Sequence, residues 1–260
     1  MRITYRPHSG NLQYWKDRWS GGIRDSGRLD TGSYPGAQAM KTIIGDRPEG
    51  PVLEAGCGLG RVPLYFHWQG VDIVGMDIVS SILDSIAKTE PGLPLCSGSV
   101  CALPFKDQAF SAVLAFGLYH NLETGLEEAL DETDRVLKSG GWLCASFRQD
   151  NLHNRLVDYS RRPKKNAQRS FHKINFTVAD VRQFFRRTSM EITEIEFVTN
   201  MPLAYRLKFL RAKSQREFIE ENARGEGYLL SPLGEIVEKS LQLIFGKQIS
   251  SVMVVYARKP

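Results

Sequence analysis

Ten residues in the first quarter of the chain constrain the fold more than any other feature. Residues 52–61 read Val-Leu-Glu-Ala-Gly-Cys-Gly-Leu-Gly-Arg, a short apolar run with one acid, followed by three alternating glycines. This pattern predicts a buried strand that turns through the glycines directly into a helix. Because glycine has no Cβ, the backbone N–H groups of such a turn lie open to a ligand. The stretch therefore predicts an α/β unit with a ligand site at the end of its first strand.

Short apolar runs alternate with helical patterns through the middle of the chain. We expect strands at 51–55, 72–76, 93–97, 111–116 and 142–147, and helices at 60–68, 79–88 and 123–138. Further on, the expected elements are a helix that Thr177 caps, strands at 192–198 and 252–257, and helices at 203–222 and 233–245. Such alternation is typical of a parallel sheet with helices on both faces, so the predicted fold class is doubly wound α/β.

The composition is that of an ordinary globular protein, with 42% hydrophobic and 24% charged residues among 260, and we expect one domain with insertions. The four cysteines form no CxxC pair and no histidine stands at ligand spacing from them, so neither a metal site nor a disulfide framework is predicted. The first residues lack the apolar block of a secretory signal, and the longest uncharged run, 108–122, is too short and polar to span a bilayer. We therefore expect a cytoplasmic protein with no membrane partner.

A dinucleotide-binding turn would read Gly-x-Gly-x-x-Gly, but Arg61 stands where its last glycine should be. The stretch from Glu54 to Gly60 instead resembles the acidic glycine turn of class I S-adenosylmethionine-dependent methyltransferases. The resemblance is to members that act on small molecules and have a methyltransferase domain of type 11 or 25. Further blocks resemble the family's later motifs in the same order, and together they cover roughly residues 50–200: Asp77, residues 103–105, 110–116, 135–143 and 176–185.

The resemblance implies a mostly parallel seven-stranded sheet whose last strand is antiparallel. It implies S-adenosylmethionine as cofactor and S-adenosylhomocysteine as product. We expect residues 1–45 to form an N-terminal arm or lid. Residues 46–260 would form the methyltransferase domain, with 148–176 and 200–248 as a helical cap that holds the substrate against the carboxyl edge of the sheet.

By the same resemblance, Glu54 orients the ammonium group of the cofactor, the glycines approach its methionine part, and Asp77 accepts hydrogen bonds from the ribose. Ser99 stands where many members carry an acid for the adenine amino group, so either its hydroxyl or the Val100 backbone would read the base. The expected cofactor site comprises Glu54, Ala55, Gly56, Cys57, Gly58, Gly60, Arg61, Asp77, Ile78, Ser99, Val100 and Phe116.

Methyl transfer to a hydroxyl or an ammonium group needs a base, because the acceptor must lose a proton. His120 follows the fourth predicted strand and is the candidate base, with a packing or capping histidine as the alternative. Tyr119 is the second candidate catalytic residue and would line the acceptor pocket, with a place in the core as the alternative. Tyr14, Trp19, Tyr34 and His172 are candidate substrate contacts, although the aromatic residues near the N-terminus could equally fasten a terminal helix to the sheet.

Three functions stay open at this stage. The first is methyl transfer to an oxygen or nitrogen of a small metabolite by a monomer or homodimer. The second is RNA methylation through the basic segment 161–169, and the third is cofactor binding without catalysis. Nicotinamide-dependent oxidation is more distant. Six apolar residues with helical spacing favour the inside of the cap over a membrane-binding face: Leu203, Leu207, Leu210, Ile236, Leu241 and Ile244.

Overall fold

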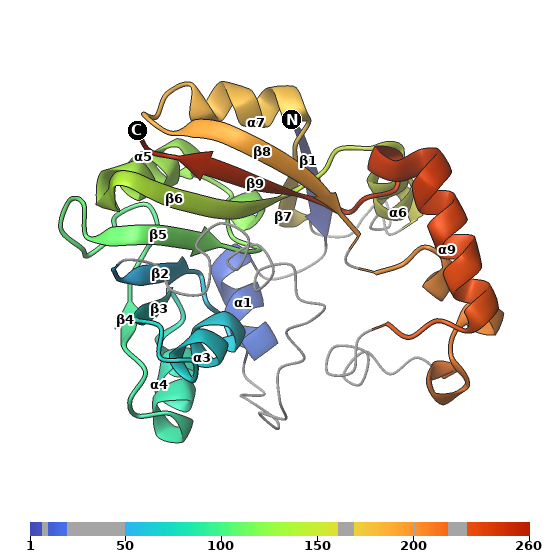
Figure 1. The fold of residues 1–260 in the computed structure, drawn as a ribbon, viewed down its shortest axis with the longest axis horizontal. Coiled ribbons are helices and arrows are strands. Elements are labelled where there is room, and N and C mark those ends of the chain that lie inside the picture. Colours follow the sequence, from blue (N-terminus) through green and yellow to red (C-terminus); the bar gives the residue numbers. More distant parts are fainter. Residues whose placement is uncertain (7–9, 20–49, 161–168, 200, 218–227) are drawn as a thin grey trace.

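The computed structural model describes residues 1–6, 10–19, 50–160, 169–199, 201–217 and 228–260 (Figure 1). Its centre is a seven-stranded sheet, whose strands are, in spatial order, β4 (Leu95–Ser97), β3 (Ile73–Asp77), β2 (Val52–Ala55), β5 (Phe110–Ala115), β6 (Leu137–Arg148), β9 (Val252–Arg258) and β8 (Glu191–Val198). The first five pair in parallel, whereas β9 runs antiparallel to both β6 and β8. The predicted fold class and each strand predicted from the apolar runs are confirmed.

Helices cover both faces of this sheet because its inner strands are apolar on both sides. In β5, Val113 and Ala115 belong to one buried cluster, and Ala112 and Leu114 to the other, as the two-residue period of a strand requires. The first cluster includes apolar residues of α5 (Leu126–Val136) and α7 (Val178–Phe185). The second includes those of α3 (Arg61–His67) and α4 (Ser80–Thr89). The chain therefore has the layered core that the alternating pattern predicts.

The start of α7 shows how local sequence fixes a helix boundary. Thr177 Oγ1 accepts the backbone N–H of Asp180 at 3.1 Å, and the Asp180 carboxylate accepts the N–H of Thr177 at 2.8 Å. This reciprocal capping box satisfies two N–H groups that the helix leaves without partners. The prediction of Thr177 as the N-cap is confirmed.

The first residues of the chain pair with a distant segment. β1 (Arg2–Arg6) pairs antiparallel with β7 (Ser170–Asn175) in a second, two-stranded sheet. Arg2 also contacts the carboxylates of Asp150 and Asp158, both at 2.8 Å, and Arg148 contacts Asp158 at 2.8 Å. This ion-pair network joins the N-terminal strand, the end of β6 and α6 (Leu152–Ser160).

The cap differs from its prediction. In place of a helix beginning at 203, the structure has three short 3-10 turns, Ala204–Arg206, Lys208–Leu210 and Lys213–Gln215. The reason is long-range pairing: Arg211 forms a β-bridge with Leu230, and the N–H of Ala212 donates to the carbonyl of Leu229 at 3.0 Å. These bonds hold the chain extended where a helix would have to continue.

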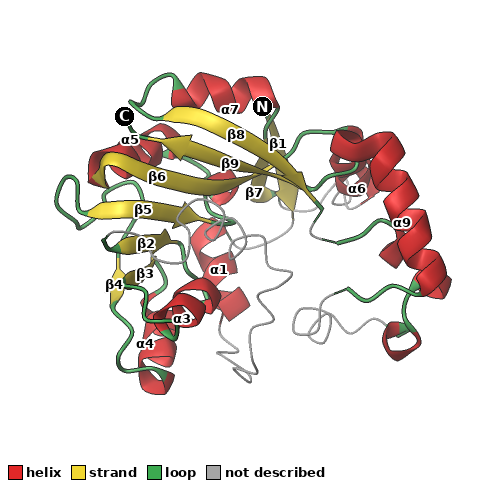
Figure 2. Ribbon diagram, in the orientation of Figure 1, coloured by secondary structure: helices red, strands yellow, loops and turns green. Residues whose placement is uncertain are grey.

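The second predicted cap helix is present as α9 (Pro232–Phe245), which Ser231 caps. Both α6 and α9 lie beyond the end of the sheet at which the β5 arrow points (Figure 2). Leu210 is buried, as expected for the inside of a cap. However, Leu207, Ile236 and Ile244 are exposed, so the expectation that all the helically spaced apolar residues point inward is wrong.

Candidate functional site

The three glycines after β2 have the backbone geometry for which glycine is needed. Gly56, Gly58 and Gly60 have φ angles of 73°, 51° and 71°, in the left-handed region that disfavours other residues. A Cβ on Gly56 would lie 2.9 Å from Leu118 Cδ1, and one on Gly60 would lie 2.8 Å from Ile86 Cδ1. The turn is therefore tightly packed as well as free of side chains, and α3 begins directly after it.

Asp77 ends β3 beside this turn and holds it in place. One carboxylate oxygen accepts the N–H of Gly58 at 2.8 Å, and the other accepts the N–H of Val79 at 2.9 Å. Burial raises the pKa of the Asp77 carboxyl, and these hydrogen bonds oppose that shift. A carboxylate can accept about four hydrogen bonds, so Asp77 keeps capacity for ligand hydroxyls. The sequence did not reveal its second role as the anchor of the glycine turn.

Glu54 places a buried carboxyl group next to the same turn. Its side chain is almost fully buried in β2, and its Oε2 atom has no hydrogen-bond partner among the described residues. Burial raises the pKa of the Glu54 carboxyl well above its usual value, and the negative charge of Asp77 adds to this shift. A buried carboxylate oxygen without a partner costs free energy that a cationic ligand group would recover. The residues present therefore fit a ligand that carries an ammonium group.

The other predicted cofactor residues gather around the same strand ends. Ala55 and Cys57 are buried, the N–H of Cys57 donates to the carbonyl of Met76 at 2.9 Å, and burial raises the pKa of the Cys57 thiol. That shift argues against a nucleophilic thiolate. Arg61 begins α3 and Phe116 follows β5, half-buried against the second buried cluster.

Two positions bear on how an adenine ring would be recognised. Ile78 directly follows Asp77 and is 54% exposed, so its apolar surface is available to a flat ring. Ser99 Oγ accepts the N–H of Cys101 at 3.2 Å, and Val100 beside it is buried. The hydroxyl of Ser99 thus already serves the local turn, which favours the Val100 backbone as the group that would read the edge of an adenine.

His120 lies in the short 3-10 turn Tyr119–Asn121, after β5, and is buried. Its Nδ1 lies 3.3 Å from the carbonyl oxygen of Ser146, which can only accept a hydrogen bond, so Nδ1 carries the proton and Nε2 is the acceptor. Burial lowers the pKa of His120 to about 3, and the charges of Lys173 and Arg148 act in the same direction. Ser146 Oγ also accepts the N–H of Gly117 at 2.8 Å. Ser146 therefore positions this turn, a role that its place in the sequence does not indicate.

Tyr119 belongs to the core. Its side chain is fully buried and stacks on Phe147 with ring centroids 5.5 Å apart, and its hydroxyl lies 2.8 Å from Thr133 Oγ1. Burial raises the pKa of Tyr119. These contacts favour the packing alternative for Tyr119 over a catalytic role.

Helix α1 (Asn11–Trp19) lies next to the histidine turn. Asn11 Nδ2 donates to the carbonyl of Asn121 at 2.7 Å, and Trp15 packs against the second buried cluster. The Tyr14 and His172 rings meet edge to face with centroids 6.0 Å apart, so the structure brings two candidate substrate residues together. The Trp19 side chain, Tyr34 and most of the basic segment, residues 161–168, lie outside the described residues.

The described ranges contain neither a membrane-spanning helix nor a metal-binding cluster. None of the helices there combines the length and apolar character needed to cross a bilayer. In the same parts of the chain, no three His, Cys, Asp or Glu side chains lie close enough together to hold a metal ion.

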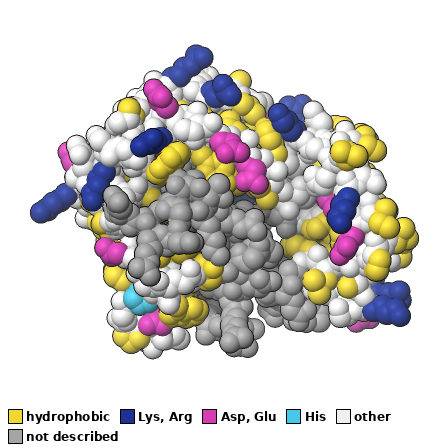
Figure 3. All heavy atoms as spheres, viewed as in Figure 1, with side chains coloured by type: hydrophobic (Ala, Val, Ile, Leu, Met, Phe, Trp, Pro, Cys, Tyr) yellow, Lys and Arg dark blue, Asp and Glu magenta, His cyan; other side chains and the backbone are white. Residues whose placement is uncertain are grey.

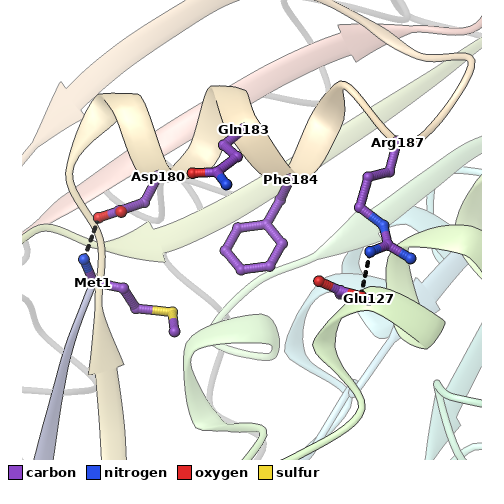
Figure 4. Close-up of a pocket in the computed structure, with 6 residues that line it drawn as sticks. All are labelled: Met1, Glu127, Asp180, Gln183, Phe184 and Arg187. Carbon is purple, nitrogen blue, oxygen red and sulfur yellow. Dashed lines mark ion pairs between the residues drawn. The ribbon is translucent and has the colours of Figure 1, made fainter.

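A separate hollow of about 400 Å³ lies between α7, α5 and the N-terminus (Figure 4). Two ion pairs border it, the Met1 amino group with Asp180 and Arg187 with Glu127. The residues that line it are Met1, Glu127, Asp180, Gln183, Phe184 and Arg187. None of them belongs to the glycine turn or to the histidine turn, and its charged groups already pair with one another.

Comparisons with known proteins agree with the geometry around the glycine turn. Residues 53–145 match the family model described as a methyltransferase domain. Over 96 residues the chain is 38% identical to the demethylmenaquinone methyltransferase of Streptomyces avermitilis. The aligned stretch covers 36% of this chain and 41% of that protein. The chain thus spans less than half the length of this relative.

Solved structures resemble the whole fold at low sequence identity. A chain of the Haloferax volcanii complex between the Trm112 activator and a methyltransferase superposes with a TM-score of 0.61 and 16% identity, covering 94% of this chain and 97% of that one. An S-adenosylmethionine-dependent methyltransferase from Methanosarcina mazei superposes with a TM-score of 0.56 and 16% identity, covering 85% and 96%. At this identity the likeness establishes the fold alone.

Proposed function

The chain belongs to the class I S-adenosylmethionine-dependent methyltransferases, and from that premise we propose that it transfers a methyl group from this cofactor to an oxygen or nitrogen of a small metabolite. The observation that carries the proposal is the buried Glu54 oxygen, which has no hydrogen-bond partner in the part of the chain that the structure describes, beside a turn of three left-handed glycines that Asp77 anchors. Free cysteines favour a cytoplasmic location.

Each part of the site has a partner in the cofactor. Glu54 would bind the ammonium group, the turn from Gly56 to Gly60 would lie against the methionine part, and Asp77 would accept from the ribose hydroxyls. Ile78 and the Val100 backbone would contact the adenine. When bound, the cofactor supplies a methyl group that its sulfonium already activates.

The work left to the protein is mainly orientation. Holding two reactants in line within a site that excludes water can supply about 7–11 kcal/mol of the activation barrier. The acceptor would lie beyond the carboxyl ends of β5 and β6, because open parallel sheets bind ligands there. Residues of α1, β7 and the histidine turn border this region, so Tyr14 and His172 are proposed contacts of the acceptor.

His120 is the proposed proton acceptor for a hydroxyl or ammonium substrate. The carbonyl of Ser146 fixes its tautomer, which leaves the Nε2 lone pair as the basic position. Since the pKa of His120 is lowered to about 3, the imidazole is neutral at physiological pH but only weakly basic. We therefore expect His120 to accelerate methyl transfer by about 100-fold, which is the low end of the usual range for general bases.

A labelling experiment tests the proposal. The chain is incubated with S-adenosylmethionine that carries a tritiated methyl group and with a fractionated cell extract. The expected result is label in a small-molecule fraction together with S-adenosylhomocysteine, and its loss in Glu54→Gln. Label in the RNA fraction would favour the RNA methyltransferase alternative. Tight cofactor binding without turnover in any fraction would favour a non-catalytic binding protein.

A further inference from the structure

Helix α9 carries a wider apolar face than the rest of the cap covers. Successive residues of a helix are about 100° apart, which places Gly234, Val237 and Leu241 on one side. On this side Gly234 packs so closely that an added Cβ would lie 2.2 Å from the carbonyl oxygen of Leu210, and Val237 and Leu241 are half-buried. The adjacent side also has apolar residues, and these are exposed by 57, 63, 88 and 70%: Leu233, Ile236, Leu243 and Ile244.

The segment 201–217, which packs on α9, adds to this apolar surface. The carbonyl of Leu210 accepts the N–H of Ser231 at 2.9 Å, and the Glu238 carboxylate accepts the N–H of Ala204 at 2.9 Å. Within this segment, Leu207 and Phe209 are largely exposed. Exposed aliphatic and aromatic side chains therefore occur on both of the packed elements.

Basic residues accompany these apolar residues. Segment 201–217 contains five basic residues and one acidic residue, namely Arg206, Lys208, Arg211, Lys213 and Arg216 against Glu217. Lys208 and Lys213 are exposed. Figure 3 shows hydrophobic and basic side chains close together along the edge of the molecule where α9 lies.

We infer that this cap surface, defined by Leu207, Phe209, Leu233, Ile236, Leu243 and Ile244 with Lys208 and Lys213, docks on an anionic lipid bilayer. Aliphatic side chains can enter the boundary between headgroups and acyl chains while lysines bind lipid phosphates, and the two contributions add. Single-stranded nucleic acid would instead be held by stacking on rings, and Phe209 is the one ring in the set. A protein interface is depleted of lysine at its centre. The docking is independent of the proposed methyl transfer.

Vesicle sedimentation tests the inference on the full chain. The vesicles consist of phosphatidylcholine alone or of equal parts phosphatidylcholine and phosphatidylglycerol. The chain is expected to sediment with the anionic vesicles, and the double variant Ile236→Ser with Ile244→Ser is expected to bind at least about tenfold more weakly. Lys208→Glu with Lys213→Glu should weaken binding by at least about tenfold as well, since each basic residue near the surface contributes roughly fivefold.

Matched controls separate docking from nonspecific adhesion. Trp68→Ser removes a side chain of similar exposure on the core, and Lys88→Glu with Lys106→Glu makes the same change in charge there. Both should bind vesicles like the unchanged chain, and circular dichroism melting confirms folding. The inference is overturned if no vesicle binds, or if the core variants lose as much binding as the cap variants. It is also overturned if the apolar variants bind normally and instead convert a dimer to a monomer.

Discussion

Residues 53–145, which match the methyltransferase domain, and the cap use their apolar residues in opposite ways. Every residue of β2 is buried, including its one acid, and Gly56 and Gly60 in the turn that follows pack against side chains. In α9, by contrast, Gly234 is the one buried residue and large aliphatic side chains remain exposed. Close packing leaves the glycine turn few alternative shapes, which suits a fixed cofactor. The cap retains exposed apolar surface, which docking on a bilayer as proposed above would use.

The largest effect is expected where the two regions meet. Asp158 of α6 pairs with Arg148 of β6 and Arg2 of β1, and its side chain is 8% exposed. Asp158→Ala would leave two guanidinium groups without this partner, and should lower the free energy of unfolding by about 3 kcal/mol in urea denaturation. Asp107→Ala removes an exposed carboxylate that also pairs with an arginine, Arg135, and should cost less than about 1 kcal/mol. Equal losses of stability in both variants would show that the ion pairs between core and cap contribute no more than an exposed ion pair.

A second prediction sharpens the account of the core. Gly60 and Gly70 both have positive φ angles, of 71° and 76°, but only a Cβ on Gly60 would meet another side chain, that of Ile86. Gly60→Ala should therefore lower the free energy of unfolding by about 2 kcal/mol or more, and Gly70→Ala by about 1 kcal/mol. A larger loss of stability for Gly70→Ala than for Gly60→Ala in thermal denaturation would show that packing against Ile86 does not hold the glycine turn in place.

A third effect is a dependence of stability on pH. The pKa of Glu54 is raised in the folded chain, so the folded state holds its proton over a pH range in which the unfolded state has lost it. The free energy of unfolding of the free chain should thus fall as pH rises above about 4.5, until the folded pKa is passed. Glu54→Gln should reduce this slope in urea titrations at several pH values. An unchanged slope would mean that Glu54 is charged in the folded chain.

What could be predicted from the sequence follows the same division. The strands of the sheet were predictable because residues such as Val113 and Leu114 report burial through their own apolar character. The glycine turn was predictable because positive φ angles select glycine. The roles of Ser146 and of Asp77 as anchor were not predictable, since each depends on a backbone group of another strand end. The cap helix at 203 was predicted wrongly because the bridge between Arg211 and Leu230, not local periodicity, decides that backbone.

Strand β1 was missed for a related reason. Its partner β7 lies about 170 residues away in the sequence, and its five residues alternate half-buried and exposed rather than forming an apolar run. A strand of this kind is stabilised by its partner and by the pairing of Arg2 with Asp150 and Asp158. Short strands held mainly by long-range contacts leave little local signal.

Calorimetric titration of the free chain with S-adenosylmethionine, S-adenosylhomocysteine and NAD is the most direct check on the cofactor site. The first two compounds should bind and NAD should not. Asp77→Ala should bind both at least about tenfold more weakly, since hydrogen bonds to a charged group contribute about 1.5–3 kcal/mol. Asp84→Ala, which removes an exposed carboxylate of α4, should leave the affinities unchanged. Unaltered affinity in a folded Asp77→Ala chain, or binding of NAD instead, would contradict the assignment of this site.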